Sequence, residues 1–414
     1  MQVSQRWMSD RVPLEPHRVD VGAMIRRVLP VYLVSRACVL AGAAVVAAEL
    51  RADQNLAAER MLDVGDPHAT APVTTATRPM LDVLTSWDGL WYLELVRSGY
   101  PRSVPPNVSY HVDEARAAFF PLFPLLGRFV DRILPGGDTT AVLILNALLG
   151  FVVVVLVGLI GQRLYGQRIG TTAATLTALF PGSFVLSFAY SEALMMVLAA
   201  GCLWCLVERD WGAAGVLAAL ATATRPNGVA LVAACAVAAL FAIADRREWR
   251  ALLAPALAPV GFVVFQLWLG RHTDEPGVWF RVQREAWDEG ASFGWTALSN
   301  TVHAVVDPLT SPTDTVTALS LAALVVLLFV SWRARLPLLL SAYSWGIVVL
   351  MLVPATVTAR PRFIFTAFPL FIGAAKWFEE RRSTDGSTWT VLCLSCGAGL
   401  AAVTALYGVF GAIP

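Results

Sequence analysis

The segment from Ser86 to Tyr100 reads SWDGLWYLELVRSGY, and after a proline-bearing stretch the chain continues over Ala118–Pro124 as AFFPLFP. This region is polar enough to lie outside a membrane, whereas almost everything that follows it is apolar. It places one carboxylate, Asp88, between two tryptophans. Long loops in compact domains usually carry function, so the rest of the chain is expected to be organised around this loop.

The composition predicts a membrane protein. The chain has 414 residues, of which 57% are hydrophobic and 15% charged, and its mean hydropathy is +0.63. Soluble domains are about 45–50% apolar and about 25% charged. The excess is arranged in long runs, which indicates an all-α integral membrane protein that crosses the bilayer many times. The net charge of +1 argues against a basic surface for nucleic acid.

The first apolar run, Val28–Leu50, predicts a membrane anchor, because a signal-peptide core is only about 7–15 residues long. Ten further spans are expected, for about eleven in total. They lie near 138–162, 171–190, 192–207, 212–224, 228–244, 251–270, 316–332, 336–356, 362–378 and 388–411. Several are shorter than the roughly 20 residues that cross a bilayer, which is tolerated where helices line a cavity.

Arginines just before the first span, Arg26 and Arg27, place the N-terminal segment 1–27 in the cytoplasm by the positive-inside rule. Threading the chain from there gives short inner loops, most of which bear arginine: Arg163–Arg168, Glu208–Trp211, Asp245–Arg250, Arg333–Arg335 and Glu379–Arg382. The outer side receives a catalytic loop at 51–137 and a second loop at 271–315. Residues 28–414 are therefore expected to form one transmembrane domain of a bacterial inner-membrane protein, with an extracytoplasmic active site.

A short helix is expected to begin near Trp87, with Thr85 or Ser86 as its N-cap. One apolar stripe at helical spacing is formed by Trp87, Leu90, Trp91 and Leu95. The tryptophans suit the headgroup level, so this helix is predicted to lie on the outer membrane surface. Asp88 falls near its positive N-terminal end, and Tyr92 shares the face of Asp88 one turn on.

Transfer of a sugar from a lipid phosphate needs few protein groups. The phosphate is already a good leaving group, so one base for the acceptor hydroxyl and cations for the phosphate are enough. Asp88 is the candidate base, and Arg225, Arg360 and Arg362, all predicted on the outer side, are candidate phosphate ligands. The structural alternatives are a helix-capping carboxylate and interfacial snorkelling arginines.

Other polar residues are secondary candidates. Glu192 is expected either at an interfacial turn between helices or in a structural or acceptor-binding role, and Asp113 and Glu114 are favoured as solvated loop residues. The histidines lack metal-ligand spacing, so no metal ion or cofactor is expected, and a divalent cation is not predicted. The second outer loop is rich in aromatic residues that suit sugar stacking or the membrane interface, namely Trp279, Trp287, Phe293 and Trp295.

Taken together, these motifs resemble the PIG-V-type mannosyltransferases over about residues 80 to 375. The resemblance is carried by Trp87–Tyr92, Ser98–Tyr100, Ala118–Leu125, Tyr190–Glu192, Ala221–Gly228 and Arg362–Leu370. It implies a GT-C-type fold and an inverting enzyme that takes mannose from a polyprenyl-phosphate carrier on the non-cytoplasmic side. The family's loop aspartate maps to Asp88. Substrate-binding roles are expected for Trp87, Tyr92, Glu192, Arg225, Asn227, Arg360 and Arg362.

The sequence therefore predicts a membrane glycosyltransferase with membrane lipids, a polyprenyl-phosphate sugar and a lipid or glycolipid acceptor as its partners. A phosphatidylinositol mannoside or lipoglycan would suit a bacterial member as acceptor. A transporter or flippase of lipid-linked sugars is the main alternative, although such proteins favour inverted repeats and polar sites at mid-membrane. A non-catalytic subunit that only binds a lipid carrier is a third possibility.

Overall fold

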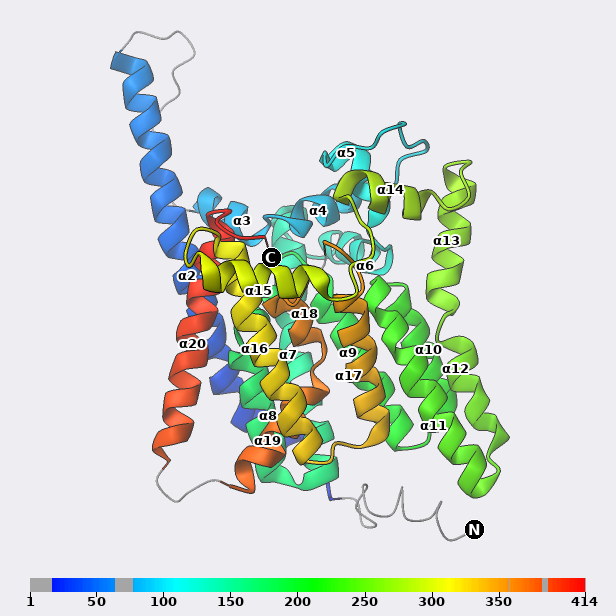
Figure 1. Ribbon diagram of the computed structural model, residues 1–414. Helices are drawn as coiled ribbons and strands as arrows, with labels where there is room; N and C mark the ends of the chain where they lie inside the picture. Colours follow the sequence, from blue (N-terminus) through cyan, green and yellow to red (C-terminus); the bar gives the residue numbers. More distant parts are fainter. Residues whose placement is uncertain (1–16, 64–76, 357, 382–385, 414) are drawn as a thin grey trace.

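The computed structural model describes residues 17–63, 77–356, 358–381 and 386–413. Over these ranges the chain is a bundle of helices (Figure 1), and the only extended pairing is a single antiparallel bridge between Ala291 and Pro354. The predicted all-α class is confirmed. Only part of the N-terminal segment, predicted at 1–27, lies within the described residues.

The described helices, with η marking 3-10 turns, are α2 Val21–Asp63, α3 Thr77–Leu84, α4 Asp88–Ser98, α5 Val112–Ala115, η1 Arg116–Ala118, α6 Leu122–Asp131, α7 Gly137–Tyr165, α8 Gln167–Leu179, η2 Pro181–Leu186, α9 Glu192–Val207, α10 Trp211–Thr222, η3 Pro226–Val229, α11 Ala230–Arg246, η4 Trp249–Leu252, α12 Leu253–Leu257, α13 Val260–His272, α14 Val278–Trp287, α15 Trp295–Val306, α16 Pro312–Arg333, α17 Leu338–Leu352, α18 Pro361–Thr366, α19 Pro369–Glu379 and α20 Ser387–Gly408.

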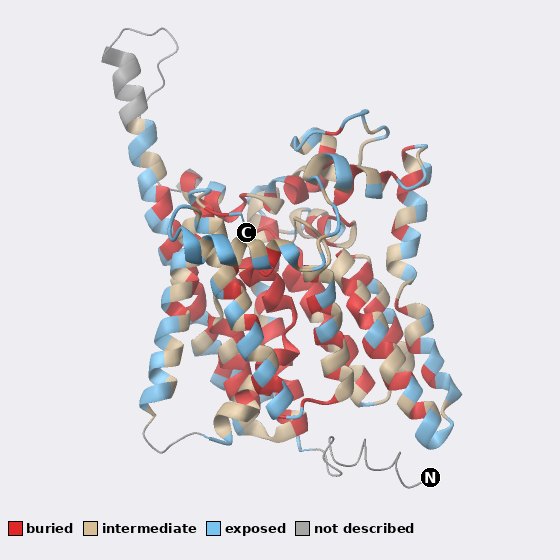
Figure 2. Ribbon diagram, viewed as in Figure 1, coloured by how far each residue is buried: buried red, intermediate tan, exposed pale blue. Residues whose placement is uncertain are grey.

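Six of the described helical segments are long and apolar enough to cross a membrane: Val21–Asn55, Gly137–Tyr165, Pro226–Arg246, Trp249–His272, Pro312–Arg333 and Ser387–Gly408. Three shorter apolar helices, α9, α10 and α17, lie among them. The buried residues concentrate in the interior of the bundle, while the outer helices are exposed along one side (Figure 2). The chain is thus a multi-pass membrane protein; the count of about eleven spans stays a prediction.

Two predicted spans are broken rather than continuous. In the span expected at 171–190, the α-helix α8 already ends at Leu179. The span expected at 362–378 is divided into two helices, α18 and α19. A proline follows each break, and its missing N–H and its ring prevent the preceding helix from continuing. Before Pro369 the chain leaves the helical conformation at Ala367, which has ψ 41°. Before Pro181 it does so at Phe180, because proline disfavours a helical conformation in the residue before it. Phe180 before Pro181 accordingly has ψ 136°.

The break after α8 is held by Arg36, a buried arginine of α2. Its Nη1 donates to Ser183 O at 2.8 Å and to Ser187 Oγ at 3.0 Å, and its Nη2 donates to Ser183 Oγ at 2.9 Å. Backbone carbonyls freed by a broken helix must find other partners inside a membrane. Arg36 supplies them and fixes the path of η2.

The predicted inner loops lie together at one end of the bundle. The first and second loops are joined by an ion pair between Arg163 and Glu208 at 2.6 Å. The second and third loops are joined by an ion pair between Arg209 and Glu248 at 2.8 Å. The last loop joins through Arg168 and Glu379 at 2.5 Å. At the opposite end lie α3, α4, α5 and α14 (Figure 1), and we call this the Asp88 end. The predicted grouping of these loops is confirmed; which end faces the cytoplasm stays a prediction.

Candidate functional site

Four charged side chains from distant parts of the sequence meet at the Asp88 end. Arg362 Nη1 donates to Asp88 Oδ2 at 2.8 Å, and Arg225 Nη1 donates to Glu192 Oε2 at 2.8 Å. The pairs also cross, because Arg225 Nη1 lies 3.8 Å from Asp88 Oδ2 and Arg362 Nη1 lies 3.9 Å from Glu192 Oε1. Each arginine is therefore shared between both carboxylates.

Asp88 is presented by a strained turn. The backbone of Trp87 has φ 56° and ψ −127°, and Gly89 N donates to Ser86 O at 3.2 Å, which makes Ser86–Gly89 a type II′ turn. A bulky residue at positive φ costs of order 1–3 kcal/mol and tends to occur at functional sites. The predicted cap is wrong, because the hydroxyls of Thr85 and Ser86 donate to Leu81 O and Val83 O instead.

Glu192 is the first residue of α9, where the helix dipole favours a carboxylate. The segment before it is held by Asn146 of α7, whose Nδ2 donates to Tyr190 O at 2.8 Å and to Val185 O at 3.3 Å. Ser191 Oγ accepts from Arg225 Nη1 at 3.1 Å and lies 2.5 Å from the Tyr92 hydroxyl. Tyr92 thereby links the loop helix α4 to the charged cluster, as its position one turn after Asp88 predicts.

Arg225 lies just after the end of α10, and Pro226 prevents the helix from continuing. The preceding residues are fixed on both sides. Leu122 N at the start of α6 donates to Ala223 O at 3.2 Å, and Thr222 Oγ1 donates to Ala258 O at 2.9 Å. These two hydrogen bonds therefore fix the backbone that carries the Arg225 guanidinium.

Arg362 lies in the first turn of α18, which packs directly on η2. Its guanidinium lies over the Phe363 ring, at 4.6 Å from the centroid, and over the Tyr190 ring at 5.6 Å. Such contacts favour a planar, permanently charged group. The backbone of η2 lies very close to that of α18 at Gly182. If Gly182 carried a Cβ atom, that atom would lie 2.1 Å from Pro361 O.

Substitution of Gly182 by alanine should therefore displace the backbone that carries Arg362. Overpacking of this kind costs roughly 1–3 kcal/mol or more, so we expect a lower melting temperature together with reduced activity. The matched control is Gly212→Ala in α10, where the nearest atom to an added Cβ is a side-chain oxygen at 4.0 Å. Thermal unfolding of both variants in detergent tests the prediction, and an unchanged melting temperature for Gly182→Ala would contradict it.

The cluster is almost completely buried but retains one accessible oxygen. The Glu192 side chain has no exposed surface, whereas 15% of the Asp88 side chain is exposed. Asp88 Oδ1 accepts no hydrogen bond from any described residue. Asp88 can therefore interact with a hydroxyl from outside while Arg362 holds its other oxygen.

A third arginine lies beside the cluster. Arg360, which is also buried, lies within electrostatic range of Asp88 and Arg362, and its Nη2 donates to Thr356 O at 3.1 Å. Glu289 also lies within electrostatic range of Arg360, so three arginines and three carboxylates are gathered here and each arginine can turn from an internal carboxylate to an external anion. Among the described residues, Arg225 Nε, Arg362 Nε and the hydroxyls of Tyr190 and Tyr407 are buried without a hydrogen-bond partner. These donors are suited to the oxygens of a phosphate.

Aromatic side chains from both loops at the Asp88 end pack beside the cluster. Trp91 of α4 stacks on Phe119 with ring centroids 5.5 Å apart, and Trp287 of α14 lies 5.8 Å from Trp91 and 5.3 Å from Tyr110. Trp91 is buried, so the prediction that the tryptophan stripe lies at the headgroup level is wrong for this residue. Burial raises the pKa of Tyr110 to about 12, so its hydroxyl stays protonated at neutral pH.

The remaining predicted residues lie further from the cluster. Trp87 is half-buried, and its Nε1 donates to Tyr407 O at 3.0 Å, so its indole anchors the strained turn to α20. Within the described residues, no hydrogen bond joins the Asn227 side chain to the cluster. No three His, Cys, Asp or Glu side chains in that part of the chain could together hold a metal ion.

Some contributors were not predicted from the sequence. Ser191 bridges Tyr92 and Arg225, Asn146 fixes the approach to Glu192, and Tyr407 anchors the turn through its carbonyl. Ser191 and Tyr190 could have been predicted from the sequence, because they adjoin Glu192 in a polar break between two apolar runs. Asn146 and Tyr407 each lie singly in a long apolar run, which gives no signal of what they contact.

Residues 117–269 match the family model described as Dolichyl-phosphate-mannose-protein mannosyltransferase. This segment contains Glu192 and Arg225, and the match makes the chain similar to the GT-C glycosyltransferases. The matched family is not the PIG-V type, so that finer relationship stays a prediction. No curated protein matches the chain.

Solved structures that match this chain include ArnT from Cupriavidus metallidurans in the apo state, with 17% identity and a TM-score of 0.48 over 73% of this chain and 56% of that one. ArnT bound to undecaprenyl phosphate has 14% identity and a TM-score of 0.48 over 77% and 71% of the two chains. The archaeal oligosaccharyltransferase AglB from Archaeoglobus fulgidus, in complex with an inhibitory peptide and a dolichol-phosphate, has 13% identity and a TM-score of 0.38 over 89% and 55%. This chain thus spans little more than half the length of apo ArnT and of AglB.

Proposed function

We propose that the protein is a membrane glycosyltransferase that moves mannose from a polyprenyl-phosphate carrier to a hydroxyl of a lipid or glycolipid. The observation that carries the proposal is the convergence of Asp88, Glu192, Arg225 and Arg362 at one end of a membrane bundle. The partial match to mannosyltransferases that are named for a dolichyl-phosphate donor supports the same class. The site is proposed to face the extracytoplasmic side of a bacterial inner membrane.

Asp88 is proposed as the general base. Its Oδ1 is the carboxylate oxygen that can accept a hydrogen bond from the acceptor hydroxyl, because Oδ2 is already bound by Arg362. As the hydroxyl oxygen bonds to the anomeric carbon, its proton passes to Asp88 and the bond from that carbon to the phosphate oxygen breaks. A positioned base of this kind typically contributes 10²–10⁴-fold to the rate.

The arginines are proposed to hold the donor phosphate. The donor phosphate is proposed to contact donor atoms of Arg225 and Arg362 that the carboxylates leave unused, such as Nε, which has no protein partner in either residue. The lipid phosphate gains negative charge as the glycosidic bond breaks, and preorganised cations stabilise that charge without reorganisation. Arg360 adds a third positive charge within electrostatic range. No acid is required, since the phosphate leaves as an anion.

A single displacement with inversion is the expected stereochemistry. Retention by double displacement needs a carboxylate nucleophile that reaches the sugar in addition to the base. Glu192 is unsuited to this role, because its side chain has no exposed surface and is held by Arg225. Of the two carboxylates in the cluster, Asp88 is the one with exposed surface, so the acceptor is expected to attack the anomeric carbon directly.

An assay with purified protein in liposomes tests the proposal. Labelled polyprenyl-phosphate mannose is supplied with a bacterial glycolipid extract as the acceptor, and labelled polyprenyl-phosphate glucose serves as the comparison donor. We expect the mannose label to appear in a new lipid product, together with unlabelled carrier phosphate. Movement of intact donor across the bilayer without product would indicate a flippase instead, and binding alone would indicate a non-catalytic subunit.

A further inference from the structure

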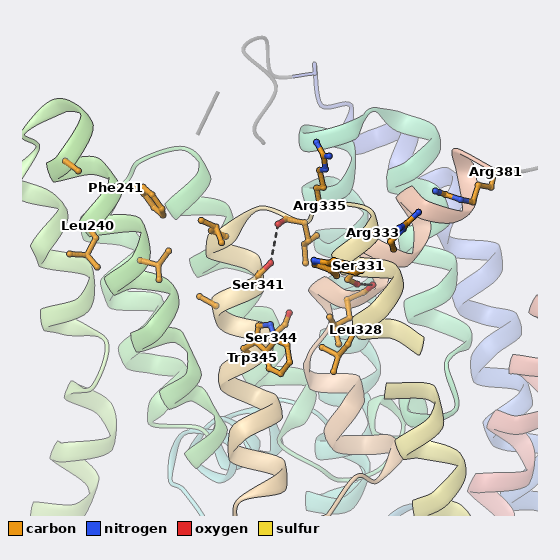
Figure 3. A pocket seen from close by; sticks show the side chains of 17 residues that line it. Leu240, Phe241, Leu328, Ser331, Arg333, Arg335, Ser341, Ser344, Trp345 and Arg381 are labelled. Atoms are coloured by element: carbon orange, nitrogen blue, oxygen red, sulfur yellow. Dashed lines mark hydrogen bonds between the residues drawn. The ribbon is translucent and has the colours of Figure 1, made fainter. Parts of the chain in front are cut away.

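A large cavity lies at the end of the bundle opposite Asp88. Its volume is about 1220 Å³, and it is lined mainly by residues of α11, α17 and α16, with α17 lying between the other two helices (Figure 3). The turn that joins α16 to α17 borders it. Lys376 Nζ ties this turn to α19 by donating to Ala334 O at 2.8 Å. The cavity is therefore separate from the charged cluster of the candidate active site.

The walls of the cavity are apolar and face outward. Leu240, Trp332 and Trp345 line it and are 67%, 71% and 55% exposed. Side chains of this kind on the outside of a membrane bundle lie against lipid tails. The hydroxyl groups inside offer little to a polar ligand, because Ser331, Ser341 and Ser344 donate to backbone carbonyls. The interior thus suits a hydrocarbon chain rather than a sugar.

Three arginines border the same cavity: Arg333, Arg335 and Arg381. Figure 3 shows them toward the end of the bundle, while Leu328 and Trp345 lie deeper along the helices. Arg381 is 3.7 Å from Glu380 and donates to Trp377 O at 3.2 Å. The side chains of Arg333 and Arg335 contact no carboxylate or hydrogen-bond acceptor among the described residues. Two exposed guanidinium groups therefore remain for an external anion.

We propose that this cavity binds one phospholipid with an anionic headgroup. An acyl chain occupies the apolar space between α11 and α17, and the headgroup phosphate contacts Arg333 and Arg335. Basic pockets between membrane helices recognise anionic headgroups in this way. The charge complementarity selects against zwitterionic lipids, and the apolar interior distinguishes a lipid from a free phosphate ion.

The bound lipid connects to the candidate active site through α17. Tyr343 OH donates to Thr366 O of α18 at 3.0 Å, and Ser331 Oγ donates to Leu370 O of α19 at 3.2 Å. A lipid that packs against α16 and α17 therefore stabilises the helices that support Arg362. The binding proposal itself does not rest on the proposed function, because it is measured without catalysis.

The test uses the full-length protein, delipidated in detergent, and native mass spectrometry. The probes are phosphatidylglycerol and phosphatidylcholine with identical acyl chains, with inorganic phosphate as a competitor. We expect phosphatidylglycerol to be retained in preference to phosphatidylcholine and not to be displaced by phosphate. Arg333→Gln with Arg335→Gln should weaken retention by roughly 30-fold, which corresponds to about 2 kcal/mol for two lost cations.

The matched control is Arg18→Gln with Arg26→Gln, which removes two exposed arginines outside the cavity and should leave retention unchanged. Ala342→Phe fills the cavity while every arginine stays in place, and it should also weaken retention. Equal retention of the two lipids, displacement by inorganic phosphate, or equal loss in the control variant would each overturn the proposal. The arginine variants alter only exposed side chains, so folding is expected to be preserved.

Discussion

Asp88→Asn is expected to abolish sugar transfer, with a loss of about 10²–10⁴-fold in rate, while the protein stays folded. Asparagine keeps the shape of aspartate, and its carbonyl oxygen can still accept the hydrogen bond from Arg362, which measures 2.8 Å in the wild-type protein. What it lacks is the ability to take the proton of the acceptor hydroxyl. The measurement is the initial rate of mannose transfer at saturating donor, with thermal unfolding as the check on folding.

The control for this variant is Asp113→Asn. Asp113 lies in the same loop, and 69% of its side chain is exposed, with His111 at 3.6 Å as its nearest ionic partner. Loss of that charge should leave the rate within twofold of the wild type, since surface pairs contribute about 0–1 kcal/mol. If Asp88→Asn retained more than about one-tenth of the wild-type rate, the base would have to be another group.

Arg362→Lys is the second substitution with a large expected effect. Lysine keeps the positive charge but has no planar fork, so it cannot contact Asp88 and approach Glu192 while lying over two aromatic rings. Loss of one preorganised donor to a developing anion typically lowers the rate by about 10²–10³-fold. We expect that loss in kcat, because the lipid phosphate is most negative in the transition state.

The control is Arg97→Lys, at the same end of the bundle. Arg97 pairs with Asp138, and 52% of its side chain is exposed. Its conversion should change neither kcat nor KM beyond twofold, because exposed pairs of this kind contribute about 0.2–1 kcal/mol. A rise in donor KM with unchanged kcat in Arg362→Lys would show uniform binding rather than transition-state stabilisation, and would contradict the role assigned to Arg362.

The helical fold follows from the sequence because apolar runs are a strong signal. The predicted span at 192–207 coincides with α9, and the span at 138–162 lies within α7. Prediction failed where a proline lies inside an apolar run, as at Pro181 and Pro369. Hydropathy does not register the missing N–H, so the run was predicted as one helix although the backbone turns there.

The candidate site was predictable only in part. Glu192, Arg225 and Arg362 lie at the ends of apolar runs, and a charged residue so near a membrane interior is a functional candidate because it is costly there. Asp88 was predicted from its place between two tryptophans in a long polar loop. Their mutual pairing was not predictable, because it depends on how four separate helices pack. The buried position of Trp91 was missed for a related reason, since an aromatic residue suits both a protein core and a membrane interface.

Arg36 and Asn146 show why supporting residues escape sequence reasoning. Each is a single polar residue in a long apolar helix, and each binds backbone carbonyls of the 178–190 segment. The residues next to Arg36 and Asn146 in the sequence do not indicate which carbonyls these side chains bind. The requirement that makes them necessary, a broken helix whose carbonyls need donors, becomes visible only once the break itself is known.

The sharing of two arginines between two internal carboxylates has a consequence for turnover. On the proposed function, the spent carrier retains a phosphate that the arginines would hold after transfer. Glu192 and Asp88 lie 2.8 Å from Arg225 and Arg362, so Glu192, and Asp88 once it has released its proton, would take the place of the departing phosphate. We expect this internal exchange to favour release of the carrier.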